Sequence, residues 1–475
     1  SPSAPSPYDD TGWTMGALSN VETVKVEDPA VLKTPMTLVP NVTAPGGARG
    51  AGSVFAINAN ADPNLATFRY AMASTPMQVA EESFEAAGKK FNPGTVIISG
   101  VSAEKLQSAA KAAGVALVGL AAEPKVKMHA LEAPRIAIVH SWQNTTEDGW
   151  FRVSFDQLKL PYTYIADTKL RVTPDLRNQF DVIILPPTGF SLSSMINGIS
   201  GKAPIPWENT ADMPDLAPPG LDSSPDIRGG LGLSGIANLE KFVSQGGLLI
   251  TVGPEMALAT DTGMADGVST RQPQGLNARG IVARAEVTDL GSPVAYGYSP
   301  DLSIYYTTGL LLSAGRGGFG RGGFGGGRGG AAGRTSGIGS LTIPDVMQTR
   351  KSDEELLKES LGGKSEKDFQ NSGRGRGAAQ AGPPPRIIVR FVPKAEDLLL
   401  SGLLTGGREI AGQPVVVDAP HGQGHILLFA ANPFWRNETS GEFSLVLNAA
   451  MNYKNLDAGS KPAAPAGGRG RRGGE

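Results

Sequence analysis

The chain has 475 residues, of which 40% are hydrophobic, so it is long enough for two or three domains with ordinary buried cores. Its 43 basic and 45 acidic residues leave a formal net charge of −2, which provides no overall attraction to nucleic acid or to an anionic membrane. Cysteine is absent, which excludes disulfides, thiolate metal sites and a cysteine nucleophile.

The absence of cysteine suits an exported bacterial protein, and we expect an extracellular or periplasmic location. The longest apolar runs fall far short of the roughly 20 residues that a membrane helix needs, so no membrane span is expected. Ser1 opens a segment rich in Ser, Pro and Ala that lacks the features of a signal peptide, so we expect the chain to begin at a processing boundary.

Residues 21–128 alternate strand and helix patterns and predict a small α/β domain. One helix in this region has a serine cap at its start and a glycine at its end, which are the usual boundary signals. The expected elements, in order, are a strand at 54–59, a helix that begins at Asp62 and Pro63, a strand at 95–99, a helix from the cap Ser102 to Gly114, and a strand at 115–120.

Residues 134–456 predict a larger, doubly wound sheet of the flavodoxin-like kind, because strands and helices alternate along the chain. Residues 181–187 are apolar without alternation, which is typical of a parallel strand covered on both faces. Ser234 is expected to cap a helix that ends at Gly246. The other expected elements are strands at 135–141, 248–253, 386–391, 414–417 and 425–430, a helix that carries Phe151, Phe155 and Leu158, and a helix at 443–451.

Two stretches rich in glycine interrupt or follow this pattern. Residues 315–385 are interpreted as an insertion that is disordered or extended over the surface, with a charged helix capped at Ser352, and residues 457–475 as a disordered tail. The insertion contains an Arg/Gly/Phe repeat of the kind that can stack on RNA bases, but the surrounding pattern is not that of a nucleic-acid module, so nucleic acid is not an expected partner. A glycine-rich arm could instead become ordered on a neighbouring copy. The residues concerned are Arg316, Phe319, Arg321, Phe324 and Arg328, with Arg469, Arg471 and Arg472 in the tail.

Five segments, at 7–16, 91–99, 135–165, 292–299 and 402–453, resemble in order the C-terminal, non-catalytic portion of large bacterial zinc carboxypeptidases. That portion includes a class I glutamine amidotransferase-like domain. The resemblance implies that residues 1–20 follow a missing catalytic domain. It also implies an accessory or assembly function that acts by protein–protein contacts, with a zinc-peptidase catalytic domain or other copies of the chain as partners.

Two other functions stay open at this point. The chain could be part of an active zinc metallopeptidase whose catalytic domain lies on another chain. It could also be a self-assembling extracellular structural protein or a carbohydrate- or peptide-binding scaffold, which would place aromatic residues near the strand ends of the sheet.

No catalytic, cofactor-binding or metal-binding residue is predicted, although several residues have suitable chemistry. The resemblance implies that such peptidases hold zinc with an HxxE pair and a third histidine, because this ligand set leaves a position open for water. His129 and Glu132 form such a pair here, but their flanks are typical of a solvated linker. Glu255 lies at the turn that carries the nucleophile of an amidotransferase; it could act as a base, but an inactive domain is the simpler interpretation.

The C-terminal region offers two further groups of polar residues. His421 and His425 flank a tight turn and could converge on a metal or an anion, or could simply be a solvated hairpin turn. The polar loop before the last helix contains Trp435, Arg436 and Glu438. Either an Arg–carboxylate pair holds this loop, or the loop forms part of a ligand pocket. Three Asn-x-Ser/Thr sites are compatible with glycosylation in a suitable host, namely Asn41, Asn144 and Asn437.

Overall fold

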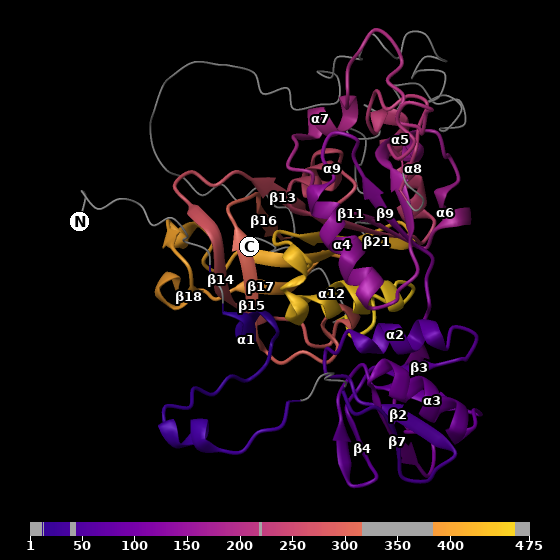
Figure 1. The fold of residues 1–475 in the computed structure, drawn as a ribbon, viewed down its shortest axis with the longest axis vertical. Coiled ribbons are helices and arrows are strands. Elements are labelled where there is room, and N and C mark those ends of the chain that lie inside the picture. The colour runs from indigo at the N-terminus through magenta and orange to yellow at the C-terminus, as the bar shows by residue number, and fades with distance from the viewer. Residues whose placement is uncertain (1–11, 13, 39–43, 218–220, 316–382, 461–475) are drawn as a thin grey trace, which may run out of the picture.

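The computed structural model describes residues 12, 14–38, 44–217, 221–315 and 383–460, and it has a smaller and a larger α/β domain (Figure 1). The α/β fold class predicted from the sequence is confirmed. The predicted insertion, its helix capped at Ser352 and the predicted tail lie almost wholly outside the described residues. No helix in the described part of the chain combines the length and the apolar composition that a membrane span requires.

The smaller domain is built on a six-stranded sheet. Strands β1 and β7, at one edge of this sheet, are parallel, and the other neighbouring strands are antiparallel. Ser102 accepts a hydrogen bond from the backbone N–H of Lys105, and Gly114 ends the same helix at φ +74°, so both predicted helix boundaries are confirmed. The elements are β1 (Gly47–Arg49), β7 (Ala116–Leu120), β2 (Val54–Ile57), β6 (Val96–Ser99), β3 (Gln78–Ala80) and β8 (Met128–Ala130) in sheet order, the hairpin β4 (Phe84–Ala86) and β5 (Lys89–Phe91), and helices α2 (Asn64–Ala71) and α3 (Ala103–Ala113).

The larger domain is built on an eleven-stranded sheet, five strands of which are parallel neighbours in the order β10-β9-β11-β12-β21. Numbered along the chain, this order is 2-1-3-4-5, which is that of the flavodoxin-like doubly wound fold. The parallel strands are β9 (Ile136–His140), β10 (Thr163–Ala166), β11 (Val182–Leu185), β12 (Leu248–Val252) and β21 (Gly424–Phe429).

Antiparallel strands extend this sheet beyond β21. They follow in the order β20 (Pro414–His421), β17 (Arg386–Phe391), β14 (Asn277–Val287) and β15 (Asp301–Thr307), while β18 (Leu399–Ser401) and β19 (Leu404–Thr405) pair with β14. A separate pair is formed by β13 (Val268–Arg271) and β16 (Leu311–Ala314). The main sheet is therefore mixed, with a parallel half and an antiparallel half.

Helices cover both faces of the parallel half, which explains why its strands are apolar throughout. In β9, Ile136 and Ile138 pack in the same core as Phe151 of α4 (Thr146–Gln157) and as α12 (Ser440–Met451). Ala137 and Val139 of the same strand pack in the opposite core. That second core is closed by α5 (Asp167–Arg171), α6 (Leu176–Gln179), α8 (Gly232–Ser244) and α9 (Met256–Asp261).

One predicted helix boundary is wrong. Ser234 does not cap α8, since the helix begins at Gly232 and its N-cap position is Leu231. The Ser234 side chain is instead 1% exposed, and its hydroxyl has no hydrogen-bond partner among the described residues. The preceding residues 198–231, which connect α7 (Leu192–Asn197) to α8, form a long excursion (Figure 1). A bridge between Ile199 and Gly229 joins its ends, and a second bridge joins Trp207 to Ser224.

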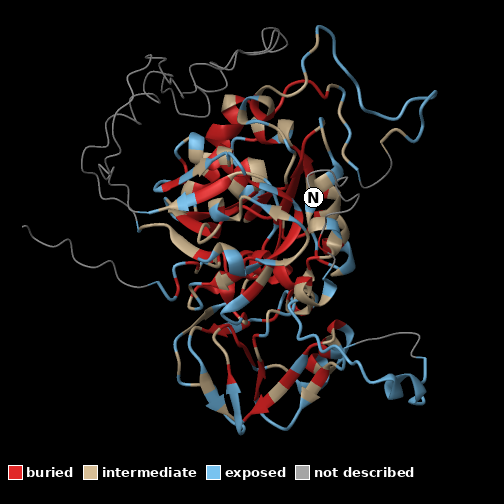
Figure 2. Ribbon diagram, turned by 90° about the vertical axis from the view of Figure 1, so that its left-hand side faces the viewer, coloured by how far each residue is buried: buried red, intermediate tan, exposed pale blue. Residues whose placement is uncertain are grey.

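The N-terminal segment contacts the larger domain before the chain forms the smaller domain. The short helix α1 (Met15–Leu18) packs Leu18 against Val282 and Tyr305 of the antiparallel strands. The chain then leaves in a segment, residues 21–38, that includes the 3-10 helix η1 (Pro29–Lys33) and is exposed along its length (Figure 2). We call residues 21–38 the arm.

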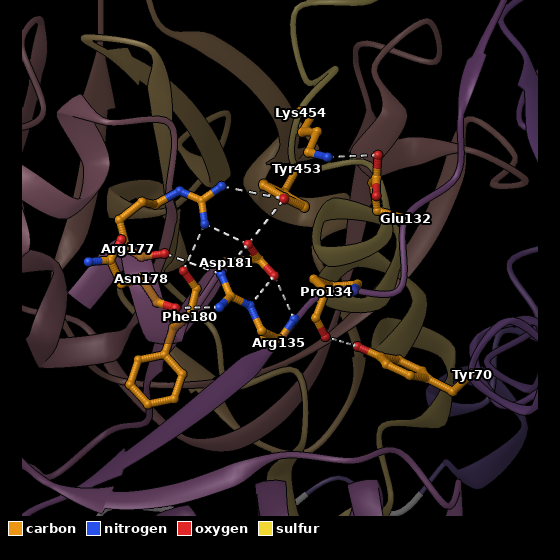
Figure 3. A network of polar contacts seen from close by, with 10 residues as sticks. All are labelled: Tyr70, Glu132, Pro134, Arg135, Arg177, Asn178, Phe180, Asp181, Tyr453 and Lys454. Carbon is orange, nitrogen blue, oxygen red and sulfur yellow. Dashed lines mark hydrogen bonds and ion pairs between the residues drawn. The ribbon is translucent and has the colours of Figure 1, made fainter. Parts of the chain in front are cut away.

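A polar network fixes the point where the chain passes from the smaller domain into β9 (Figure 3). Asp181, which precedes β11, accepts hydrogen bonds from the backbone N–H and the guanidinium of Arg135, from Arg177 and from the Tyr453 hydroxyl. The Tyr70 hydroxyl of α2 donates to the Pro134 carbonyl oxygen at 2.6 Å. The network thus connects both domains to the amino ends of the parallel strands.

Candidate functional site

The carboxyl ends of β9 and β11 are where a flavodoxin-like sheet binds its ligand, because the helices that follow these two neighbouring strands lie on opposite faces and leave a crevice. In this chain the loop after β9 and the loop after β11 are joined at that place. The Asn144 side-chain amide donates to the Thr188 carbonyl oxygen at 2.8 Å. A direct bond between the loops therefore crosses the position of the expected crevice.

Glu255 lies beside this bond, at the end of the adjacent strand β12. The chain turns after β12 at Gly253, whose φ of +64° favours glycine, and the 3-10 helix η2 (Gly253–Glu255) follows. The backbone N–H of Thr188 donates to Glu255 Oε1 at 2.7 Å, and the Thr188 hydroxyl donates to the same oxygen. Glu255 Oε2 is buried and has no partner among the described residues.

Burial raises the pKa of Glu255 to about 8. The carboxyl group is therefore mostly protonated at neutral pH, which does not favour Glu255 as a general base. It is a neutral acid that holds the Thr188 loop. The sequence placed Glu255 in the turn that follows residues 248–253, and the structure has it there. The residues that bury Glu255, and so decide its protonation, come from other parts of the chain.

A second cluster lies at the ends of β9 and β10 and was not predicted. His140 is 3% exposed, and its Nε2 lies 3.2 Å from Asp222 Oδ2. Asp222 belongs to the excursion 198–231 and also accepts from the backbone N–H of Ala166 at 2.9 Å. His140 Nδ1 and the indole N–H of Trp142 are buried without a partner among the described residues.

Aromatic rings surround His140. Tyr164 stacks on the imidazole with ring centroids 4.4 Å apart, and Trp142 meets it edge-on at 4.8 Å. Trp207 of the excursion lies 6.3 Å from Trp142 and is 38% exposed. We call these four residues, His140, Trp142, Tyr164 and Trp207, the strand-end aromatics.

Two carboxyl groups adjoin the strand-end aromatics. The Tyr164 hydroxyl donates to Asp148 Oδ2 at 2.6 Å, and burial raises the pKa of Asp148 above its ordinary value. Burial likewise raises the pKa of Asp167 to about 6. Among the described residues, no group of three or more His, Asp or Glu side chains could hold a metal ion. The arrangement offers hydrogen bonds and ring surfaces rather than a nucleophile beside a base.

The sequence pattern gives a weak indication that His140 is functional and no indication for Asp222. His140 is the first polar residue after the apolar strand pattern that opens the larger domain, which is the position where a flavodoxin-like sheet presents functional side chains. Asp222 lies in a segment rich in Pro and Gly, about 80 residues further along, and only the tertiary fold brings it to His140.

The HxxE pair does not form a site. His129 lies in β8 and its ring nitrogens face Glu81 Oε1 at 3.1 Å and Asn452 Oδ1 at 2.9 Å, whereas Glu132 pairs with Lys454 at 3.0 Å. The expectation of a solvated linker is also wrong. Residues 128–130 form an edge strand next to β3, and this strand lies against the larger domain.

His421 and His425 also have separate partners. His425 is 5% exposed, with Nδ1 2.8 Å from Asp418 Oδ1, whereas His421 lies 3.9 Å from Glu240 of α8. Burial alone would lower the pKa of His425, but the neighbouring Asp418 and Asp457 raise it to about 10. The expectation of a solvated turn is therefore wrong for His425, which is held as a buried imidazolium.

The loop before α12 is held by ring stacking. Trp435 stacks on Tyr305 with ring centroids 3.7 Å apart, and the Arg436 guanidinium lies over the Trp435 ring, 4.6 Å from its centroid. Among the described residues, no ion pair joins Arg436 to Glu438. The charge of Arg436 instead acts on Glu147, where it opposes the rise in pKa that burial causes. Arg436 and Asn437 have positive φ values of 48° and 58°.

Of the remaining residues that the sequence singled out, two asparagines lie in the described part of the chain and the others do not. The side-chain amides of Asn144 and Asn437 donate hydrogen bonds within the fold, to Thr188 and Gln157. The others lie outside the described residues, namely Asn41, the Arg/Phe repeat from Arg316 to Arg328, and Arg469, Arg471 and Arg472.

No family model and no curated protein matches the chain. Similar solved structures include a cytoplasmic protein of Salmonella typhimurium, with 11% identity and a TM-score of 0.31 over 67% of this chain and 98% of that one. A ThuA-like protein from Bacteroides uniformis has 9% identity and a TM-score of 0.32 over 69% of this chain and 94% of its own.

A Thermoplasma acidophilum protein described as one of the GMP synthase subunits has 6% identity and a TM-score of 0.29 over 66% of this chain and 94% of its own. The neighbours therefore include a ThuA-like and an amidotransferase-like protein, and the descriptions of these three name no carboxypeptidase. Likenesses at these TM-scores assign neither a family nor an activity.

Proposed function

We propose that this chain is a non-catalytic accessory portion of an exported zinc-carboxypeptidase-like protein and that it acts by protein–protein contacts. Its partner is a zinc-peptidase catalytic domain. The parallel strand ends, where an enzyme of this fold class would hold its reactive groups, contain a protonated Glu255 and a His140 whose polar contact is a carboxylate. Among the described residues, no hydroxyl or other nucleophile is hydrogen-bonded to the His140 ring, which supports a binding role.

The observation that carries the proposal is the exposure of the arm. Seven of its aliphatic side chains project into solvent, and Val24, Leu32 and Leu38 are 72%, 80% and 89% exposed. A run of exposed apolar side chains marks a contact surface, because leaving it in water costs about 25 cal/mol for each Å² of apolar area. The seven residues are Val21, Val24, Val26, Val31, Leu32, Met36 and Leu38.

The arm is also positioned for such a contact. Its N-terminal end is fixed to the larger domain by α1, where Leu18 is buried and the Gly12 N–H donates to the Gly280 carbonyl oxygen at 2.6 Å. Beyond its C-terminal end the chain continues to β1, the edge strand of the smaller domain. A partner bound to the arm would therefore be held next to both domains.

The test is titration of the purified chain with a purified zinc-carboxypeptidase catalytic domain from the same organism, followed by calorimetry and light scattering. Replacement of Val24, Val26 and Leu32 by Asp should weaken the complex by at least about tenfold, since charges would enter an apolar contact. Val172 and Leu290, which are 56% and 40% exposed elsewhere, provide the matched control when replaced by Asp. Equal affinity of the arm variant and the control would contradict the proposal, and self-association abolished by the arm variant would identify other copies as the partner.

A second candidate, a carbohydrate- or peptide-binding scaffold, is favoured by the strand-end aromatics. Sugar rings and peptide side chains stack on exposed indole rings, and Trp207 presents such a ring near the end of β9. Tryptophan fluorescence during titration with cello- and chito-oligosaccharides and with short peptides tests this function. A saturable change that Trp207→Ala removes would support it, and an unchanged spectrum would not.

A further inference from the structure

We propose that residues 22–27 of the arm are an unpaired β-strand, which joins the partner by pairing with a free edge strand of the partner's sheet. The partner is that of the proposed function, on which this inference rests, and the edge pairing adds how the two chains are joined. The segment has the sequence ETVKVE, in which Val24 and Val26 alternate with charged residues and neither glycine nor proline occurs. Such alternation of β-branched and charged residues is typical of a strand with one buried face.

The side chains of this segment lie on two faces. Lys25 Nζ lies 2.6 Å from Glu27 Oε1, so these two side chains, which are two residues apart, are on the same side of the backbone. Val24 and Val26 belong to the opposite side, and their side chains are 72% and 61% exposed. The exposed ion pair adds little stability, but it marks a polar face, and the two valines mark an apolar face.

The backbone of residues 22–27 is unpaired. Among the described residues, none of its N–H or carbonyl groups takes part in a hydrogen bond. Backbone bonding stops on either side of the segment, where the Val21 N–H donates to the Gly16 carbonyl oxygen at 3.1 Å and η1 begins after Asp28. The segment is about 20 Å long when extended, which is the length of an ordinary strand. Figure 1 shows the arm projecting away from both domains, so a second chain can reach this backbone.

In the described part of the chain, the outer strands of the two main sheets already contact other segments. The Tyr305 N–H of β15 donates to a carboxylate of α12 at 2.9 Å, and the Ala166 N–H of β10 donates to Asp222 at 2.9 Å. In the smaller domain, the Ala48 N–H of β1 donates to a glutamine of α3, and β8 lies against the larger domain. A side chain that takes an edge N–H hinders the pairing of another strand there. This favours the sheet of a different protein over that of a second copy.

The two faces of the strand decide what the partner must offer. Backbone groups of residues 22–27 pair with an open edge strand, and this pairing provides affinity whatever the sequence of that edge. Val24 and Val26 pack on an apolar face of the partner's sheet, whereas Lys25 and Glu27 stay in water. The partner is therefore a protein with a sheet that has an open edge and an apolar face beside it.

The test measures amide hydrogen exchange at single-residue resolution in the full chain, alone and bound to the purified zinc-carboxypeptidase catalytic domain from the same organism. In the complex, alternate amides within residues 22–27 should exchange at least about a hundredfold more slowly, because only every second N–H of an added strand faces its neighbour. A contact made by side chains alone would leave these amides exchanging as in the free chain. That result would overturn the inference but not the proposed function, since the complex would still have formed.

Lys25→Pro and Val26→Pro test the same pairing, because proline removes the backbone N–H and one of these two neighbouring amides faces the partner while the other faces away. One proline variant should weaken the complex at least about tenfold relative to alanine at the same position, and the other should match its alanine control, Lys25→Ala or Val26→Ala. Equal effects of the two prolines relative to their controls would overturn the inference. If the original chain forms no complex, the proposed function and the inference fall together. Far-ultraviolet circular dichroism of each variant shows that a loss of binding is not a loss of folding.

Discussion

Arg135 and Asp181 form a bidentate ion pair at the place where the chain enters the larger domain. Arg135 Nε lies 3.0 Å from Asp181 Oδ2, Nη2 lies 3.0 Å from Oδ1, and the Arg135 backbone N–H also donates to Oδ2 at 2.9 Å. Burial alone would raise the pKa of Asp181, but Arg135 and Arg177 hold it well below its usual range. Asp181 is thus a fixed anion that joins the linker to the start of β11 (Figure 3).

Asp181→Asn should destabilise the protein by about 2–4 kcal/mol, because it leaves two guanidinium groups facing a neutral amide. Urea unfolding at pH 7 measures this loss. Since the folded pKa of Asp181 is depressed, its contribution is present above the ordinary value of about 4 and is lost as the pH falls below it. Asp175→Asn is the control: Asp175 makes an exposed pair with Lys241, so its loss should change stability by less than about 0.5 kcal/mol.

Glu255→Gln should make the protein more stable at alkaline pH. The folded pKa of about 8 lies above the unfolded value near 4.5, so stability falls as the pH rises from 4.5 through 8 and the buried carboxyl loses its proton. The amide keeps the bonds from Thr188 and carries no charge. Chemical unfolding from pH 4.5 to 9 should show a gain of about 2–4 kcal/mol at pH 9 relative to the original chain, and little difference at pH 4.5. A difference that is the same at every pH would refute the assignment.

The Asp418–His425 pair should also make stability fall with rising pH, relative to a variant that lacks both charges, but over a higher pH interval than Glu255. The folded pKa of His425 is about 10 and its unfolded value is about 6.5, so its stabilising contribution is complete below 6.5 and is lost as the pH rises through 10. The difference in unfolding free energy between the original chain and D418N/H425Q should fall by about 2–4 kcal/mol over that interval. His421→Gln, in the same hairpin and next to Glu240, is the control for removal of a histidine.

Gly297→Ala should weaken the contact between the two domains. Gly297 has φ +82°, and a Cβ there would lie 2.3 Å from the backbone nitrogen of Ala61 in the smaller domain. We expect a loss of about 2–4 kcal/mol and a separate, earlier thermal transition of the smaller domain in a calorimetric scan. Gly100→Ala isolates the clash, since Gly100 also has a positive φ but no neighbour within 4 Å. Equal losses in the two variants would show that backbone strain alone is responsible.

Much of the local structure could be predicted from the sequence, because its signals are local. The cap Ser102, the end signal Gly114 and the apolar strand at 386–391 all lie where the pattern placed them. The prediction failed where a tertiary contact outweighed the local signal. Ser234 has a good cap residue type, but α8 begins before it, and residues 128–130 become an edge strand because β3 offers them a partner.

The candidate site was less predictable. The turn at Glu255 could be located from the strand before it, but the protonation of Glu255 depends on burial by segments far away in the chain. His140 and Asp222 are 82 positions apart and meet only because the excursion folds onto the strand ends. Sequence periodicity carries no information about such a meeting.

The sequence by itself determined the class of fold, since strands without alternation, separated by amphipathic helices, can bury their side chains only in a sheet covered on both faces. The tertiary structure alone decided the partner of each histidine and the neutral state of Glu255. The physical reason is that hydrophobic periodicity acts over a few residues, whereas burial, charge pairing and the fit of two domains depend on segments hundreds of residues apart.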